Sequence, residues 1–124
     1  MSSFGITRNG IPVTLSAPVY EQAVFLDSGT TLTFLPANIV ANLVTHFPEA
    51  VQSGSLYVVP CSLRSEASTI DFGFESTIIR VSFHEAIWQT GTTCVLGVGA
   101  SSGLNWVLGD TMLRGAYVKS VSDI

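Results

Sequence analysis

The alternation of hydrophobic and polar positions along the chain is mostly that of β-strands. Apolar residues alternate over residues 11–15, directly after Asn9-Gly10, a dipeptide typical of tight hairpin turns. Two β-rich runs, at residues 69–74 and 77–83, are separated by Glu75-Ser76 alone. Two strands with so short a connection predict a second hairpin.

Other apolar and β-branched runs extend this pattern over most of the chain. They predict strands over residues 19–26, 56–61, 92–98, 106–108 and 116–118. Turns are expected at Gly97, Gly99 and Gly103. A Val-Leu-Gly triplet occurs twice, at residues 95–97 and 107–109: its glycine would either let another backbone approach closely or simply end an ordinary strand. The triplet alone favours the ordinary strand end.

One segment has helical spacing instead. Pro36 suits the first turn of a helix, apolar residues then recur every three or four positions up to Phe47, and Pro48 ends the segment. Asp110 is placed to cap a short helical turn. We therefore predict an all-β fold with one or two short helices.

The composition indicates a chain that normally buries one face against something else. Of the 124 residues, 47% are hydrophobic and only 11% are charged, against about 25% charged in a typical soluble domain. No apolar run approaches the roughly 18 residues of a membrane span. With a net charge of −4 and five Lys and Arg residues, the chain is not expected to bind nucleic acid or an anionic membrane.

The two cysteines, Cys61 and Cys94, are not arranged as metal ligands. They form no Cys-x-x-Cys pair, and His46 and His84 stand at no zinc-site spacing, so no metal site is predicted. The cysteines form either a disulfide, which would imply an oxidising compartment, or two buried thiols.

The candidate for chemistry is Asp27. An apolar run delivers it into the turn Asp27-Ser28-Gly29-Thr30. Burial and the hydrogen-bond donors of this turn act in opposite directions on the pKa of the carboxyl group. Such tuning suits acid–base chemistry on water. The alternative is an ordinary turn aspartate with no catalytic role.

Several motifs, in the same order along the chain, resemble the carboxy-terminal lobe of the pepsin-like aspartic proteases. Their sequences are similar to those of fungal secreted and yapsin-like members. The resemblance covers residues 4–118. It is carried by Phe25-Leu26-Asp27-Ser28-Gly29-Thr30-Thr31, by Trp106-Val107-Leu108-Gly109-Asp110 and by the Leu-Arg-Gly-Ala-Tyr-Val segment at residues 113–118.

The resemblance implies one lobe of a double β-barrel. Asp27 would be the catalytic aspartate of this lobe, and Thr31 would line the substrate cleft. Two further groups have implied roles: an active-site hydrogen-bond network of Ser28, Gly29 and Thr30, and a psi-shaped loop of Val107, Leu108 and Gly109. The family's disulfide falls at Cys61 and Cys94.

The family's chemistry needs two aspartates that share a proton around one water, as in pepsin. No second Asp-Thr/Ser-Gly occurs in this sequence. We therefore expect residues 1–124 to be a carboxy-terminal lobe without its amino-terminal lobe and with truncated final strands. Such a lobe would be inactive alone. The complete enzyme would use no cofactor and would cleave peptide substrates in a secreted, vacuolar or cell-surface location.

Two other hypotheses stay open. Two copies of Asp27 could meet in a homodimer, as in retroviral proteases. The lobe could also be a non-catalytic binding or inhibitory module that keeps the fold.

Overall fold

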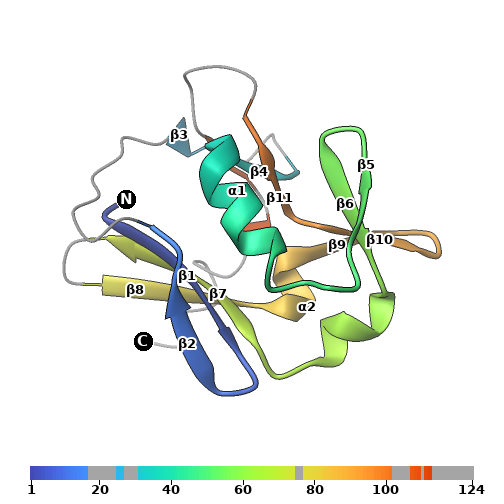
Figure 1. Cartoon of the computed structure of the whole chain (residues 1–124), viewed down its shortest axis with the longest axis horizontal. Coiled ribbons are helices and arrows are strands. Elements are labelled where there is room, and N and C mark those ends of the chain that lie inside the picture. Colours follow the sequence, from blue (N-terminus) through green and yellow to red (C-terminus); the bar gives the residue numbers. More distant parts are fainter. Residues whose placement is uncertain (17–24, 27–30, 75–76, 102–106, 110, 113–124) are drawn as a thin grey trace.

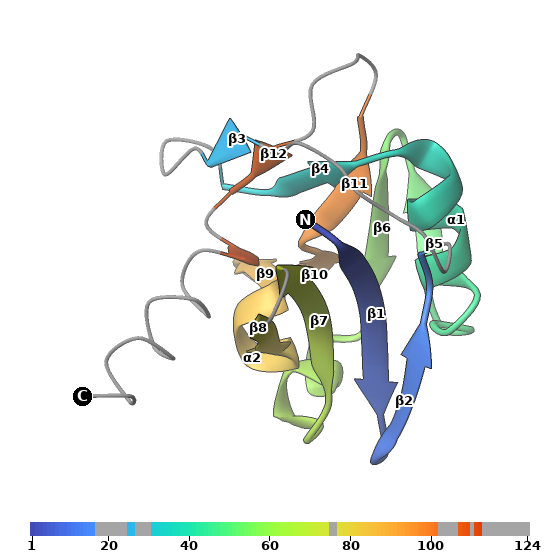
Figure 2. The same ribbon diagram turned by 90° about the vertical axis from the view of Figure 1, so that its left-hand side faces the viewer.

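The computed structural model describes residues 1–16, 25–26, 31–74, 77–101, 107–109 and 111–112. Figures 1 and 2 show three small sheets arranged around a common interior, with a helix, α1, against one of them. The predicted β-rich fold with short helices is confirmed.

The first sheet is antiparallel and has the strand order β2-β1-β7-β8. Its strands are β1 (Ser3–Arg8), β2 (Ile11–Thr14), β7 (Thr69–Phe74) and β8 (Thr77–Ser82). The predicted hairpin across residues 75–76 is confirmed, because Phe74 pairs with Thr77. Asn9 and Gly10, both with positive φ, turn β1 into β2 as expected.

The second sheet, β5-β6-β10-β9, contains β5 (Val51–Ser53), β6 (Leu56–Val59), β9 (Ile87–Thr90) and β10 (Thr93–Leu96). The strand expected to reach Cys61 ends at Val59. Pro60 has no N–H to continue the ladder, and it precedes the short 3₁₀ helix η1 (Cys61–Ser65). A disulfide joins Cys61 to Cys94, so the prediction of this bond is confirmed.

The third sheet mixes parallel and antiparallel pairs in the order β11-β4-β12-β3. Its strands are β3 (Phe25–Leu26), β4 (Thr33–Leu35), β11 (Val98–Ala100) and β12 (Val107–Leu108). Gly97 lies at the bend between β10 and β11, whereas Gly99, expected in a turn, lies within β11. Gly103 lies outside the described residues.

Two helices complete the described part of the chain. The predicted helix is α1 (Ala37–Val44), which follows Pro36 and buries Ile39, Val40 and Leu43. It ends before Pro48 is reached. The helix α2 (Phe83–Ala86) corrects the expectation that Phe83 ends a strand: Phe83 is fully buried and begins this short helix.

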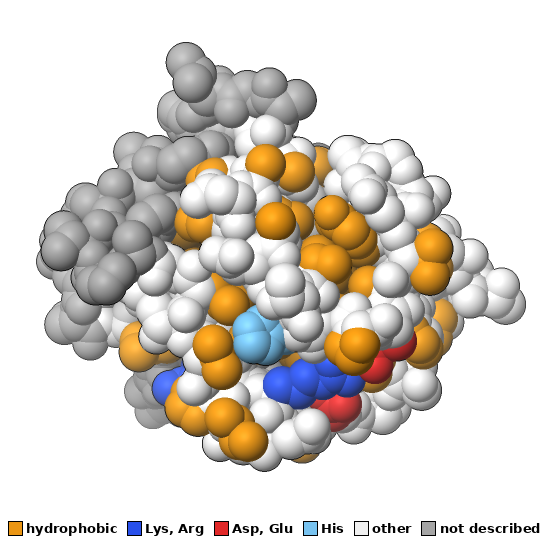
Figure 3. Space-filling model, viewed as in Figure 1, with side chains coloured by type: hydrophobic (Ala, Val, Ile, Leu, Met, Phe, Trp, Pro, Cys, Tyr) orange, Lys and Arg blue, Asp and Glu red, His pale blue; other side chains and the backbone are white. Residues whose placement is uncertain are grey.

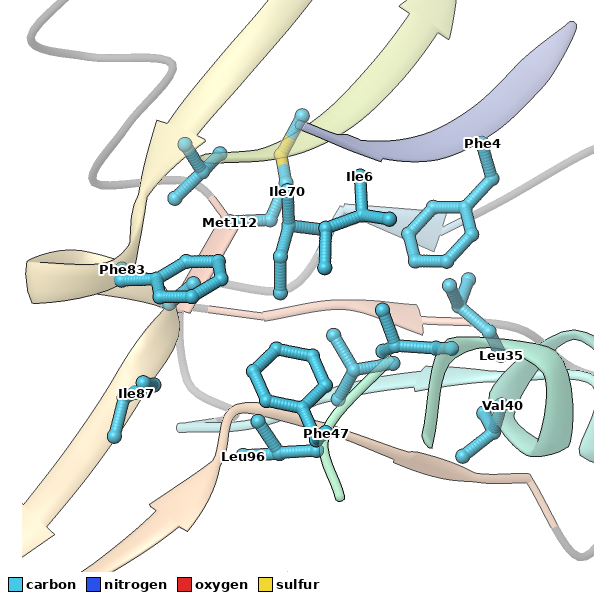
Figure 4. Close-up of a cluster of buried hydrophobic side chains, with 14 of the residues drawn as sticks. Phe4, Ile6, Leu35, Val40, Phe47, Ile70, Phe83, Ile87, Leu96 and Met112 are labelled. Carbon is cyan, nitrogen blue, oxygen red and sulfur yellow. The ribbon is translucent and has the colours of Figure 1, made fainter. Parts of the chain in front are cut away.

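The core lies between the three sheets and α1. Figure 4 shows Phe4, Ile6 and Ile70 of the first sheet facing Phe47, Leu35 and Leu96 across it, with Met112 and Phe83 at one end. Each of these side chains is almost fully buried. Phe4 and Phe72 pack edge to face, and Phe47 packs against Phe83. The packing of these buried side chains in one hydrophobic core therefore holds together strands that are far apart in the sequence.

Candidate active site

The third sheet holds the strands on both sides of the Asp27 turn. β3 ends at Leu26, the residue before Asp27, and β4 begins at Thr33. Asp27, Ser28, Gly29 and Thr30 lie outside the described residues, as do Trp106 and Asp110. The described part of the site consists of the strands that flank this turn.

β12 lies between these two flanking strands. Val107 pairs with Phe25 and Leu108 with Leu26 in a parallel ladder, and Val107 also pairs with Phe34 in an antiparallel one. Figure 2 shows β12 between β3 and β4. The segment at residues 107–109 is thus bonded to the chain entering the Asp27 turn and to the chain leaving it.

Thr31, assigned to the substrate cleft on the family resemblance, is half-buried. Its backbone carbonyl accepts a hydrogen bond of 3.0 Å from the Thr111 N–H. This bond ties the end of the Asp27 turn to the residues after β12. The cleft role of Thr31 stays a prediction.

Two buried hydroxyl groups, which sequence reasoning did not select, lie beside this segment. Thr33 is completely buried, and its Oγ1 accepts a hydrogen bond of 3.1 Å from the Gly109 N–H. The Thr111 hydroxyl lies 3.2 Å from the Thr33 hydroxyl and donates a hydrogen bond of 2.7 Å to the Gly97 carbonyl. The available signal was a threonine next to apolar residues: Leu32 and Phe34 flank Thr33, and Met112 follows Thr111.

The surroundings of Gly97 explain why the first Val-Leu-Gly triplet ends in glycine. A Cβ at this position would collide with the Ala86 carbonyl oxygen and with the Thr111 side chain. The Gly97 N–H donates to that same carbonyl of Ala86. Another backbone therefore approaches Gly97 closely, and the interpretation of this glycine as an ordinary strand end is wrong.

The ion pairs of the described residues involve the first sheet. Arg8 bonds Glu49 and Glu66, both at 2.9 Å, and Arg80 bonds Asp71 at 3.0 Å. The hydrogen bond from Arg8 holds the pKa of Glu49 below its ordinary value despite partial burial, and the same bond raises the pKa of Arg8. Figure 3 shows how few charges one face carries.

Asp71, a carboxylate that lacks the Ser-Gly context, has a structural environment. It is nearly buried and accepts hydrogen bonds from Thr7, Thr69 and Arg80. Within the described ranges, no three His, Cys, Asp or Glu side chains gather as metal ligands. No helix in the described part of the chain has the length and apolar character to cross a membrane.

Comparison with known proteins identifies the family. The family description "Eukaryotic aspartyl protease" matches residues 2–123. The chain belongs to this family. It is 35% identical to "Probable aspartic-type endopeptidase opsB" of Aspergillus oryzae, over 83% of this chain and 23% of the relative. It is 34% identical to aspartic proteinase 3 of Saccharomyces cerevisiae, over 93% of this chain and 21% of the relative.

The fold also matches a solved member of this protease group. The aspartic proteinase from Irpex lacteus aligns with a TM-score of 0.64 at 19% identity, over 90% of this chain and 36% of that structure. The chain spans between a fifth and a quarter of the length of the two fungal relatives. The part it matches is their carboxy-terminal part.

Proposed function

We infer that this chain supplies one carboxylate of a two-carboxylate aspartic endopeptidase, and that Asp27 is that carboxylate. The observation that carries the proposal is the pairing of β12 with both β3 and β4. A turn whose two flanking strands are bonded to a common third strand is held at both ends. Membership of the aspartyl protease family supports the same assignment.

Peptide hydrolysis would then use Asp27 and a second aspartate on a separate segment. One carboxylate takes a proton from the attacking water while the other gives a proton to the substrate, so the pair titrates as a unit. Ser28, Gly29 and Thr30 would hydrogen-bond the carboxylates, and Thr31 would face the peptide. The reaction needs no cofactor.

The partner in this proposal is an amino-terminal lobe carrying the second aspartate. The absence of a second Asp-Thr/Ser-Gly from the sequence supports a carboxylate that comes from elsewhere. The disulfide between Cys61 and Cys94 supports an oxidising location, either secreted, vacuolar or at the cell surface.

A chimeric enzyme tests this function. The 124-residue chain replaces the matching segment of the Aspergillus oryzae relative, and cleavage of a fluorogenic peptide is measured at acidic pH. We expect activity that Asp27→Asn abolishes. Asp71→Asn is the matched control, because Asp71 is held by structural hydrogen bonds, and this variant should stay active.

The other outcomes separate the competing functions. Cleavage by the 124-residue chain alone, rising with the square of its concentration, would indicate a homodimer of two Asp27 turns. A folded chimera that binds peptide without cleaving it, equally well after Asp27→Asn, would indicate a binding module. The first result would contradict the separate amino-terminal lobe, and the second would contradict the catalytic role of Asp27.

A further inference from the structure

The buried hydroxyls of Thr33 and Thr111 are exceptional in their surroundings. Among the described residues, only four polar or charged side chains are buried: Thr33, Ser68, Asp71 and Thr111. Two of these four touch each other beside the strand that pairs with β3. A buried polar group costs free energy unless it is hydrogen-bonded, so the bonds made here are informative.

Each of the two hydroxyl groups has one proton, and this fixes which group donates in each hydrogen bond. The Gly97 carbonyl can only accept, so the single hydroxyl proton of Thr111 is used in its 2.7 Å bond to that oxygen. With the Thr111 proton used in this shorter bond, the 3.2 Å hydrogen bond between the two hydroxyls must use the Thr33 proton, with Thr111 as its acceptor. The Thr33 oxygen in turn accepts from the Gly109 N–H. The result is a continuous chain from Gly109 through Thr33 and Thr111 to Gly97, with no hydroxyl proton unused.

This hydroxyl chain joins segments that surround the Asp27 turn. Gly109 is buried and directly follows Leu108, the partner of Leu26. Thr33 begins β4, and its own N–H donates to the Gly97 carbonyl at 2.8 Å. Thr111 also donates its N–H to Thr31. The hydroxyl chain thus fixes the end of β12 against the strand that leaves the turn.

We propose that Thr33 and Thr111 are positioning residues for the Asp27 carboxylate. Their hydroxyl chain fixes the end of β12, and β12 is paired with β3. β3 ends at the residue before Asp27, so its position sets where the Asp27 carboxylate lies. This inference rests on the proposed function. The two residues act through the backbone and touch neither the substrate nor the water.

The expected effect is on the chemical step. β3 and β12 are only two residues long as described, so their ladder alone is weak, and an unpaired Gly109 N–H would shift it. Catalytic groups must be held within about 0.5 Å of their productive geometry. A displaced carboxylate therefore lowers kcat, while peptide binding along the cleft, and hence KM, changes little.

The kinetic test introduces Thr33→Val into the chimera with the Aspergillus oryzae relative. This change keeps the shape of the side chain and removes its hydroxyl. We expect kcat to fall about tenfold, with KM changing less than about twofold. Thr33→Ser should recover most of kcat because it restores the hydroxyl. Thr93→Val is the matched control, since it makes the same replacement at an exposed strand position.

An NMR test of the 124-residue chain needs no activity. The Gly109 N–H should exchange slowly with solvent, and Thr33→Val should speed this exchange at least about tenfold. The amide resonance of Leu26 should move with it, but not in Thr93→Val. If Thr33→Val does not fold, slow Gly109 exchange in the unaltered chain and in Thr111→Ser still tests the bonds.

These readouts separate the two proposals. An inactive chimera of the unaltered chain contradicts the proposed function, and the NMR result then decides the positioning role alone. An unprotected Gly109 amide, or an unmoved Leu26 resonance in Thr33→Val, overturns the positioning role. So does a kcat equal to that of Thr93→Val.

Discussion

Leu108 and Leu26 are partners in a parallel pair of strands that is two residues long on each side within the described ranges. So short a ladder contributes little stability by itself. Its position depends on what surrounds it: β4 on the other edge of β12, and the buried bonds at Gly109. The segment leading to Asp27 is therefore held by tertiary contacts, and mutations in those contacts should affect it.

Gly97→Ala should lower the free energy of unfolding by about 2–3 kcal/mol, because the new methyl group overpacks a filled site. It would meet the backbone oxygen of Ala86, which cannot move independently, and the Thr111 side chain. Gly99→Ala is the control. Its methyl group would meet only side-chain atoms of Leu56 and Phe34, so we expect a loss below about 1 kcal/mol. Urea denaturation measures both, and equal losses would contradict the packing at Gly97.

Replacing both Cys61 and Cys94 by serine should cost about 3–4 kcal/mol, since the disulfide closes a loop of 33 positions in the unfolded chain. The unfolding midpoint is measured with and without a reducing agent. Reductant should lower the midpoint of the unaltered protein and leave that of the double variant unchanged. A double variant as stable as the oxidised protein would contradict the assigned role of the bond.

Strong local signals predicted much of this fold. The hairpin of β7 and β8 follows from two β-rich runs with a two-residue connection, and α1 follows from apolar spacing after Pro36. The family motifs indicated the cysteine pair before the structure did. In each case the decisive interactions are close in sequence or belong to a motif.

The missed elements depend on distant contacts. β1 contains Gly5, a poor strand former, and is specified by pairing with β7 more than sixty positions away. Phe83 continues the β-like sequence pattern of β8. In the fold, however, its side chain is buried in the core and the residue is the first of α2. Likewise, nothing local distinguishes Thr33 from other strand threonines. Its role comes from Gly109 and Thr111, which only the fold brings near.

Arg8→Ala should destabilise the fold by about 2–3 kcal/mol, because it leaves partly buried carboxylates without their partner. The Arg8 side chain is 19% exposed and bonds both Glu49 and Glu66. It also donates a hydrogen bond to the His46 carbonyl and lies over the Phe47 ring.

Arg80→Ala is the matched control for Arg8. Its side chain is 50% exposed, and Asp71 would keep its bonds from Thr7 and Thr69. A loss below about 1 kcal/mol is expected for this exposed pair. Thermal unfolding compares the two variants, and a larger loss for Arg80→Ala would contradict the structural ranking.

Glu49 should make stability fall in acid. Its pKa is lowered in the folded state, chiefly by the hydrogen bond from Arg8, so folding favours its ionised form. The stabilisation is complete above the unfolded pKa, near 4.5, and is lost as the pH falls through the lower folded value.

Glu49→Gln isolates this effect. It should be less stable than the unaltered protein at neutral pH by at most about 1 kcal/mol, as expected for a partly exposed ion pair. The difference should shrink as the pH falls below about 4.5 and vanish once Glu49 is protonated. Urea midpoints at a series of pH values measure it. A difference that is constant with pH, or that grows in acid, would show that the charge of Glu49 does not stabilise the fold through Arg8.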